Sequence, residues 1–285
     1  MTADAPALWN TLKHWFTEHP RVVVALSGGV DSSLVACTAR RCLNAGSVIA
    51  VISAGASLKA RDLEQARALA RQFDFPLVEI ETSEMRDPRY LSNPINRCYF
   101  CKTALYGALD RILAERFPGY DILNGSNVDD LGDYRPGLQA AAEHRVYSPL
   151  ADCGLHKHEI RQLAKDLGLP NWNKPASPCL SSRFPYGESI TQERLAQVEA
   201  AEEVLAGLGF GDVRVRYIQN TARVEVPAAD VEALRRQWPT VCAAMVRLAF
   251  DGAELDEEGL VSGKLNRVLD QNALSLKVRT TTAAK

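Results

Sequence analysis

The fold of this chain is decided by the stretch Val22-Val23-Val24-Ala25-Leu26-Ser27-Gly28-Gly29-Val30-Asp31-Ser32-Ser33. Its first five residues are apolar and mostly β-branched, a pattern typical of a strand buried on both faces of a parallel sheet. The glycine pair that follows permits a tight turn, and from Ser32 the pattern is helical. A strand, a glycine loop and a helix in this order predict an α/β fold.

The same alternation of strand and helix continues along the chain. Strands are predicted at residues 47–54, 76–81 and 120–123, and helices at residues 58–73 and 98–117. This alternation predicts a doubly wound, mostly parallel sheet within a first domain of residues 1–187. Ligands of such sheets bind beyond the carboxyl ends of the strands. We therefore expect the loops 27–31 and 124–130 to share one crevice.

A second, smaller α+β domain is predicted for residues 188–285. Residues 171–187 are rich in proline, serine and asparagine and form a linker or a functional loop. Beyond them, Thr191 is a candidate helix cap, residues 213–218 and 223–226 are typical of a hairpin, and residues 228–250 are predicted to form one helix. We expect this domain to bind the substrate and its phosphate and to mediate homo-oligomer formation.

Composition limits the class of protein. The 285 residues carry a formal charge of −2, with 46% hydrophobic and 24% charged residues, values typical of a globular enzyme. No segment has the length and apolar character of a membrane span, so we expect a cytoplasmic protein without membrane or nucleic-acid partners. Seven cysteines in a chain of this size indicate reduced thiols rather than a disulfide framework.

The glycine loop has the chemistry of a phosphate-binding site. Backbone amides at a helix N-terminus, together with serine hydroxyls, bind phosphate oxygens, so the candidate phosphate-binding residues are Ser27, Gly28, Gly29, Asp31 and Ser32. Asp31 is also a candidate Mg²⁺ ligand. The loop lacks the glycine-lysine-serine/threonine ending of a Walker loop and the three-glycine dinucleotide pattern.

These residues resemble the SGGxDS signature of PP-loop ATP pyrophosphatases, a superfamily that cleaves ATP between its α and β phosphates. The resemblance implies adenylyl transfer. The second loop, residues 125–130, also resembles this superfamily. Its carboxylates either help to bind metal or ATP, or form a solvated acidic turn.

The cysteines suggest a second centre. Cys98 and Cys101 form a CxxC step, and Cys179 lies in a proline-rich loop without core periodicity. Three thiolates can hold a 4Fe-4S cluster and leave one iron open for sulfide or substrate. The alternatives are a structural zinc site completed by Cys153 or His156, and plain buried or redox thiols. Cys37, Cys42 and Cys242 fall in helical segments and are predicted to be core residues.

With these cysteines the resemblance narrows to one PP-loop family, the sulfur transferases that make the thiocarboxylates of the nickel-pincer nucleotide cofactor of lactate racemase. The matching elements cover nearly the whole chain and are residues 27–32, 96–102, 125–130, 179–187 and 214–216. The resemblance implies that pyridinium-3,5-biscarboxylic acid mononucleotide is the substrate. It also implies that a substrate carboxylate is adenylated by ATP with Mg²⁺ and then converted to a thiocarboxylate.

The chain departs from part of that family. Members with only the Cys179-like residue are understood to sacrifice its sulfur, leaving dehydroalanine. This chain also has Cys98 and Cys101 and so resembles the cluster-bearing branch, in which a 4Fe-4S cluster delivers the sulfur. Sacrifice of Cys179 remains the alternative, and the sequence does not identify the source of sulfide.

Two arginines are candidates for binding the substrate's phosphate. Period-two alternation places Arg214 and Arg216 on one face of a strand, where two guanidinium groups can grip a phosphate with Lys102 as a third positive charge. The alternative is an exposed basic face paired with Glu225. The resemblance further implies a second metal site at Glu225, with Glu202 or Asp230.

Three other functions share some of these features. A tRNA-thiolating enzyme has the same loop and cysteines, but a charge of −2 and the lack of a lysine-rich arm weigh against it. In an ammonia-using synthetase of the amidotransferase type, the cysteines would be structural. A regulatory module that only binds adenine nucleotides would not release pyrophosphate.

Overall fold

The computed structural model describes residues 5–131, 136–261, 263, 264 and 267. The chain divides into two compact units. The N-terminal unit comprises Met1–Ser182 and Ser189–Leu195, and the C-terminal unit comprises Arg183–Glu188 and Ala196–Lys285. The chain therefore passes between the units more than once, and the predicted boundary at residue 187 lies within this passage. Each unit is described separately below.

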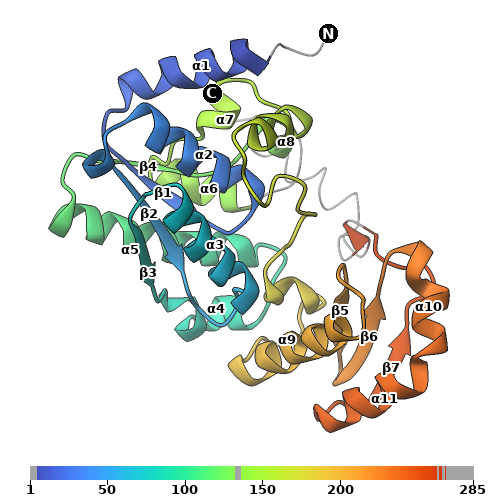
Figure 1. The fold of residues 1–285 in the computed structure, drawn as a ribbon. Helices are drawn as coiled ribbons and strands as arrows, with labels where there is room; N and C mark the ends of the chain where they lie inside the picture. The colour runs from blue at the N-terminus through green and yellow to red at the C-terminus, as the bar shows by residue number, and fades with distance from the viewer. Residues whose placement is uncertain (1–4, 132–135, 262, 265–266, 268–285) are drawn as a thin grey trace, which may run out of the picture. The chain divides into compact units, whose positions relative to one another are not determined.

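A four-stranded parallel sheet is the centre of the N-terminal unit (Figure 1), in the order β3-β2-β1-β4. The strands are β1 (Val22–Leu26), β2 (Val48–Ser53), β3 (Leu77–Ile80) and β4 (Asp121–Leu123). Val22 is paired with Val48 on one side and with Asp121 on the other. The predicted α/β fold with a parallel sheet is confirmed.

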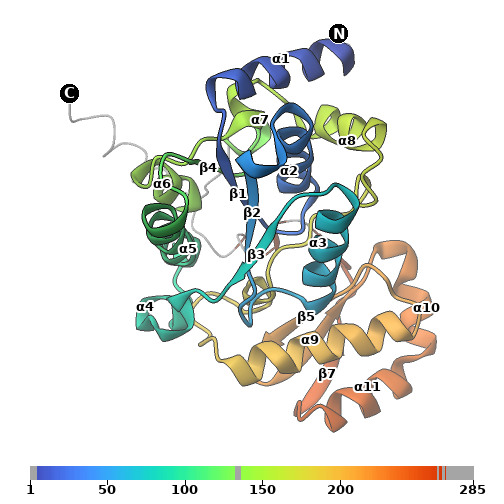
Figure 2. The ribbon, with the colours of Figure 1, turned by 60° about the vertical axis from the view of Figure 1, so that its left-hand side comes forward.

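Helices cover both faces of this sheet (Figure 2). One layer contains α1 (Ala5–Glu18), α2 (Val30–Cys42), α3 (Ala60–Gln72), α7 (Pro149–Asp152) and α8 (Lys157–Asp166), and the other contains α5 (Arg97–Arg116) and α6 (Pro136–Glu143). Alternation along β1 supplies both cores: Val22, Val24 and Leu26 pack into the first layer, whereas Val23 and Ala25 pack into the second. This two-sided burial accounts for the uninterrupted apolar run.

The order of the strands creates a switch point between β1 and β4. From β1 the chain proceeds through β2 to β3 on one side, and then returns to add β4 on the other side of β1. Open α/β sheets bind ligands at the carboxyl ends of the strands where the order reverses. The loops that follow β1 and β4 are residues 27–31 and 124–130, the two that we expected to share one crevice.

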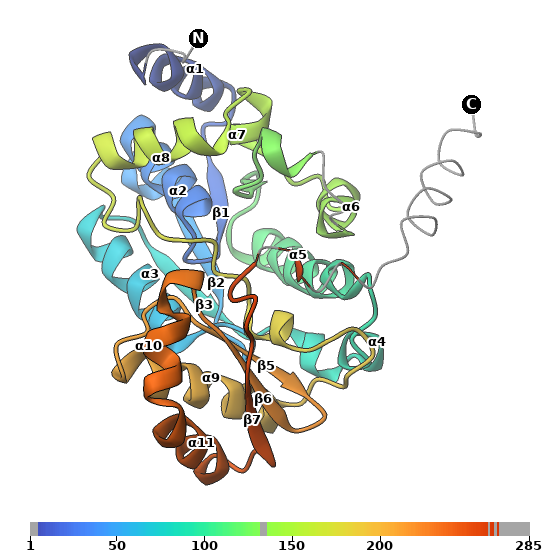
Figure 3. The ribbon, with the colours of Figure 1, turned by 90° about the vertical axis from the view of Figure 1, so that its right-hand side faces the viewer.

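The C-terminal unit is built on a three-stranded sheet in the order β5-β6-β7 (Figure 3). β5 (Arg214–Ile218) and β6 (Thr221–Glu225) form the predicted hairpin, and β7 (Gly252–Leu255) adds parallel to β6. Gln219 and Asn220 form the turn with φ angles of 46° and 63°, the left-handed conformation that two-residue hairpin turns require. The long helix α9 (Gln192–Gly207) precedes the hairpin.

The prediction of one helix over residues 228–250 is wrong. A 3₁₀ turn, Ala228–Asp230, is followed by α10 (Val231–Arg236) and α11 (Trp238–Arg247). Pro239 lies in the first turn of α11, where its missing N–H is tolerated, but it cannot continue a preceding helix. The predicted cap of α9 is confirmed, since the Arg194 amide donates to Thr191 Oγ1 at 3.3 Å.

No helix in the described part of the chain is long and apolar enough to cross a membrane.

Candidate active site

The nucleotide loop is held closed by its own serines. Gly28 has a φ of +73°, which favours glycine. The Ser32 hydroxyl accepts from the Ser27 amide at 3.1 Å and lies 3.0 Å from the Ser27 hydroxyl. α2 then starts at Val30 directly after Gly29, so the amides of its first turn face the loop as phosphate donors.

Asp31 combines a cationic partner with an oxygen that lacks one. Its Oδ2 accepts from Lys157 Nζ at 2.8 Å, whereas its buried Oδ1 has no hydrogen-bond partner. Burial raises the pKa of Asp31, and the hydrogen bond from Lys157 opposes that rise. A buried carboxylate oxygen without a donor, at the start of the phosphate-binding helix, suits a hard cation such as Mg²⁺.

The second loop packs directly against the first. A Cβ atom added to Gly125 would lie 2.5 Å from the Ser32 backbone nitrogen, so only glycine permits this approach. Asn127 caps the 3₁₀ turn Val128–Asp130, with Asp130 completing a capping box. Asp129 accepts from the Lys157 amide at 2.7 Å and lies 2.7 Å from His156 Nδ1.

These contacts describe an ordered acidic turn. The hydrogen bond from His156 and that from the Lys157 amide hold the pKa of Asp129 below its usual range. The turn positions α8, whose first residue, Lys157, reaches Asp31. Sequence reasoning missed Lys157; the only local signal was the spacing of His156 and Glu159, whose carboxylate accepts from the His156 amide at 2.8 Å.

Cys98 and Cys101 lie in the first turns of α5, and Cys179 lies in the loop before the 3₁₀ turn Leu180–Arg183. Cys98 and Cys179 are exposed, and Cys101 is partly buried. All three thiols belong to one electrostatic neighbourhood, because Cys98 and Cys179 both act on the pKa of Cys101. The structure thus places the three cysteines that the sequence singled out within electrostatic range of one another.

Cationic residues surround these thiols. Burial is the main reason that the pKa of Cys101 rises to about 12, and Lys102 opposes the rise. Burial alone lowers the pKa of Lys102, but Tyr106 and the three thiols outweigh it and the pKa is raised. Arg97, which sequence reasoning missed, is buried and lies 3.9 Å from Cys98 Sγ. Both cations stabilise thiolates over thiols.

The loop that carries Cys179 is tied to the N-terminal unit along its length. Asn171 donates to Ser33 Oγ at 3.0 Å, and Lys174 donates to the Gly28 carbonyl at 2.8 Å. Farther on, the Leu180 amide donates to the Ser57 carbonyl at 2.8 Å. The Ser181 carbonyl accepts from Arg97 at 2.7 Å. Residues 171–182 therefore run from the nucleotide loop to the CxxC turn.

The alternative ligands proposed for a zinc site lie elsewhere. Cys153 packs against the core beneath α2, on the sheet face opposite α5, and His156 is engaged by Asp129. Among the residues that the structure describes, no three His, Cys, Asp or Glu side chains form a ligand set for one metal ion. Cys37 is buried, as predicted for a core residue, while Cys42 and Cys242 are partly buried.

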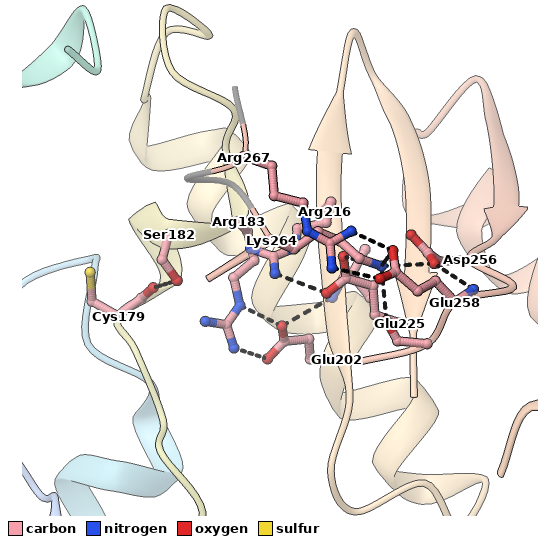
Figure 4. A network of polar contacts seen from close by, with 12 residues as sticks. Cys179, Ser182, Arg183, Glu202, Arg216, Glu225, Asp256, Glu258, Lys264 and Arg267 are labelled. Carbon is pink, nitrogen blue, oxygen red and sulfur yellow. Dashed lines mark hydrogen bonds and ion pairs between the residues drawn. The ribbon is translucent and has the colours of Figure 1, made fainter. Parts of the chain in front are cut away.

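A second polar cluster lies in the C-terminal unit (Figure 4). Arg183 and Glu202 form a two-pronged ion pair with distances of 2.7 and 3.1 Å, and Glu202 also accepts from the Val215 amide at 3.1 Å. Arg216 donates to Glu225 at 2.9 Å. Both ion pairs are buried. The cluster is therefore a pre-ordered set of charges within this unit.

Arg214 lies within electrostatic range of two other arginines of this cluster. Burial, followed by the nearby Arg183 and Arg216, lowers the pKa of Arg214. The alternative of an exposed basic face is wrong, because Arg214 and Arg216 are only 9% and 5% exposed, although Arg216 does pair with Glu225. Glu225 has a second cation, Lys264, at 3.6 Å. Two neighbouring guanidinium groups that lower the pKa of Arg214 favour a bound anion at this place.

The parallel sheet, the SGGxDS loop at its switch point and the second glycine loop define the class of PP-loop ATP pyrophosphatases. A family model described as NAD synthase matches residues 9–89, which contain β1, the nucleotide loop and the strands β2 and β3. A GMP synthase of Carboxydothermus hydrogenoformans is 27% identical over 65% of this chain and 39% of its own length. The N-terminal part of the chain is thus similar to NAD synthase and GMP synthase.

Full-length relatives identify the family. An uncharacterized protein of Synechocystis sp. is 45% identical over 91% of this chain and 97% of its own length. Pyridinium-3,5-bisthiocarboxylic acid mononucleotide synthase of Lactiplantibacillus plantarum is 36% identical over 90% of this chain and 92% of its own length. The chain belongs to the family of this synthase. The predicted family and the predicted enzyme class, an ATP-dependent sulfurtransferase, are confirmed.

Proposed function

We propose that this enzyme adenylates a carboxylate of pyridinium-3,5-biscarboxylic acid mononucleotide and converts it to a thiocarboxylate, with sulfur delivered at Cys98, Cys101 and Cys179. The substrate class follows from the name of the Lactiplantibacillus relative. The observation that carries the proposal is the course of residues 171–182. This loop is bonded to the nucleotide loop at Gly28 and brings Cys179 beside the CxxC turn.

The three thiols fit an iron–sulfur cluster in kind and in surroundings. A single zinc ion needs its sulfur ligands about 2.3 Å from one centre, whereas cluster thiolates bind separate irons and do not converge on one atom. Two of the thiols are exposed and one is partly buried, and Arg97 and Lys102 beside them favour the thiolate form that binds iron. A 4Fe-4S cluster held by Cys98, Cys101 and Cys179 would supply an open iron able to carry sulfide.

The remaining residues have distinct roles in this proposal. Amides of the nucleotide loop hold the ATP phosphates, and Asp31 holds Mg²⁺, so that the substrate carboxylate attacks the α phosphorus and pyrophosphate leaves. The acyl-adenylate then loses AMP when sulfur attacks its carbonyl carbon. Arg214 and Arg216 bind the phosphate of the mononucleotide, and Lys102 supplies positive charge beside the three thiols.

Sacrifice of Cys179 is the alternative route for sulfur. The exposure of Cys179 is the observation that favours it, because an exposed thiolate can attack the acyl-adenylate itself. Elimination would then leave dehydroalanine at position 179, and each chain would react once. The two routes share the adenylation step and differ in the state of Cys179 after the reaction.

The experiment measures iron and acid-labile sulfide per chain after anaerobic reconstitution, followed by thiocarboxylate product per chain. Cys98→Ala, Cys101→Ala and Cys179→Ala are expected to lose the cluster, whereas Cys242→Ala, which alters a partly buried thiol of α11, is expected to keep it. More than one product per chain, with Cys179 intact by mass spectrometry, supports delivery from the cluster. Absence of a cluster in the wild type, with dehydroalanine formed, would leave the sacrificial route.

A further inference from the structure

Lys174 makes more polar contacts to the nucleotide-binding edge than its place in an irregular loop predicts. Its Nζ donates to the Gly28 carbonyl at 2.8 Å, to Asp62 Oδ1 at 3.0 Å and to Gln65 Oε1 at 2.7 Å. An ammonium has three donors, and all three are used here. The Lys174 side chain is 16% exposed, so these bonds are largely shielded from water.

Asp62, in the first turn of α3, contacts both the nucleotide loop and the loop of residues 171–182, which carries Lys174. Its carbonyl oxygen would lie 3.0 Å from a Cβ on Gly28, so it packs against the nucleotide loop. Its other carboxylate oxygen accepts from Ser177 Oγ at 3.2 Å. The buried carboxylate of Asp62 thus accepts from both Lys174 and Ser177. Ser177 lies only two positions before Cys179.

We propose that Lys174 is a positioning residue that couples occupancy of the nucleotide loop to the position of Cys179. The value of this coupling for sulfur transfer rests on the proposed function, but the coupling itself is a property of the N-terminal unit. Bound phosphates orient the amides of the nucleotide loop. The Gly28 carbonyl belongs to that loop, and Lys174 transmits its orientation to residues 174–179 through the ion pair with Asp62.

Thermodynamic linkage makes this coupling measurable in both directions. A nucleotide that favours one position of Cys179 must bind more tightly to that position, and a change at Cys179 must alter nucleotide affinity by the same factor. Coupling free energies of this kind usually correspond to factors of about 5 to 150. Iodoacetamide reacts with the accessible position of Cys179, so the alkylation rate follows the population of that position. We therefore expect nucleotide to change this rate by about fivefold or more.

The test measures alkylation of Cys179 by iodoacetamide in the full-length thiol form of the protein, using peptide mass spectrometry. The nucleotide is α,β-methylene-ATP with Mg²⁺, which cannot release pyrophosphate, at a concentration that saturates each variant. Wild type and Lys174→Arg are expected to show the change in rate, since arginine also donates to a carbonyl and a carboxylate. Lys174→Met is expected to lose it while still binding the nucleotide.

Lys165→Met is the matched control, because this exposed lysine of α8 lies over the Trp172 ring at 5.0 Å. The proposal would be overturned if nucleotide did not change the alkylation rate of Cys179 in wild type. It would also be overturned if nucleotide changed the rate equally in wild type and in Lys174→Met, because the nucleotide would then shield Cys179 directly. If Lys174→Met does not fold, Ser177→Ala carries the test and must weaken the change. The alkylation assay contains no sulfur acceptor, so it does not depend on sulfur transfer. A failure to make thiocarboxylate in a separate assay would refute the proposed function but would not affect the alkylation result.

Discussion

Replacing Gly125 by alanine introduces a methyl group between the two loops of the nucleotide site. The new Cβ would lie 2.5 Å from the Ser32 nitrogen, 2.9 Å from the Ser32 Cα and 3.0 Å from the Asp31 carbonyl carbon, all of them backbone atoms. Ordinary contact begins at 3.4 Å, so the loops must separate by about 0.9 Å at the tightest point. No side-chain rotation can relieve this clash.

The expected loss is large for catalysis and moderate for stability. A displacement of about 1 Å in a catalytic arrangement costs about 100-fold in rate, and an extra methyl group in a packed site costs about 1–3 kcal/mol of folding free energy. The assay is the rate of substrate-dependent AMP formation, together with urea denaturation to separate the two effects. Gly46→Ala is the matched control, because a Cβ there meets no atom within 4 Å.

The result that refutes this reasoning is AMP formation by Gly125→Ala within twofold of the wild-type rate. That outcome would mean that the spacing between the loops does not set the position of the phosphates. A loss of activity that Gly46→Ala shares would also refute it, since the effect would then not depend on the contact with Ser32.

Three further predictions concern single groups. Glu202→Ala removes the buried two-pronged ion pair with Arg183 and is expected to cost about 3–5 kcal/mol in urea denaturation. Glu254→Ala, which breaks an exposed pair, should cost at most about 1 kcal/mol, and equal costs would contradict this. Because burial raises the pKa of Asp31, this carboxylate loses its charge at a higher pH than an ordinary aspartate does. The KM for MgATP should therefore rise on mild acidification, and a KM that is constant down to pH 5 would contradict the assignment of Asp31 to Mg²⁺. With its pKa at about 12, Cys101 should be the slowest of the three site thiols to react with iodoacetamide at pH 8, and its rate should still increase above that pH; mass spectrometry that found it fastest would contradict this.

The fold was predictable because its signals are local. The apolar run Val22–Leu26 and the glycine pair after it specify a buried strand and a helix start within twelve residues, and the hairpin at β5 and β6 follows from its alternation. β7 was missed because Gly252–Leu255 has only four residues, begins with glycine and contains no β-branched residue. It becomes a strand only because β6 offers a free edge to pair with, which is tertiary information.

The sequence identified the cysteines and arginines of the candidate site but not the residues that position them. Cysteines and paired arginines are rare enough to attract notice at any spacing. Lys174, Lys157 and Arg97 are common residue types, and their partners lie far away in the sequence; Lys174 and Asp62, for example, are 112 positions apart. Such contacts depend on the folded path of residues 171–182, for which the sequence has no periodic pattern.

The route of the chain between its units limits how the protein can be divided. Arg183–Glu188 belongs to the C-terminal unit, yet the following Ser189–Leu195 belongs to the N-terminal unit. A fragment beginning at residue 189 would lack Arg183, the partner of the buried Glu202, and Phe184, which stacks on Tyr217. A fragment that keeps the C-terminal unit whole must therefore begin at or before Arg183, and the N-terminal unit expressed without it would lack Ser189–Leu195.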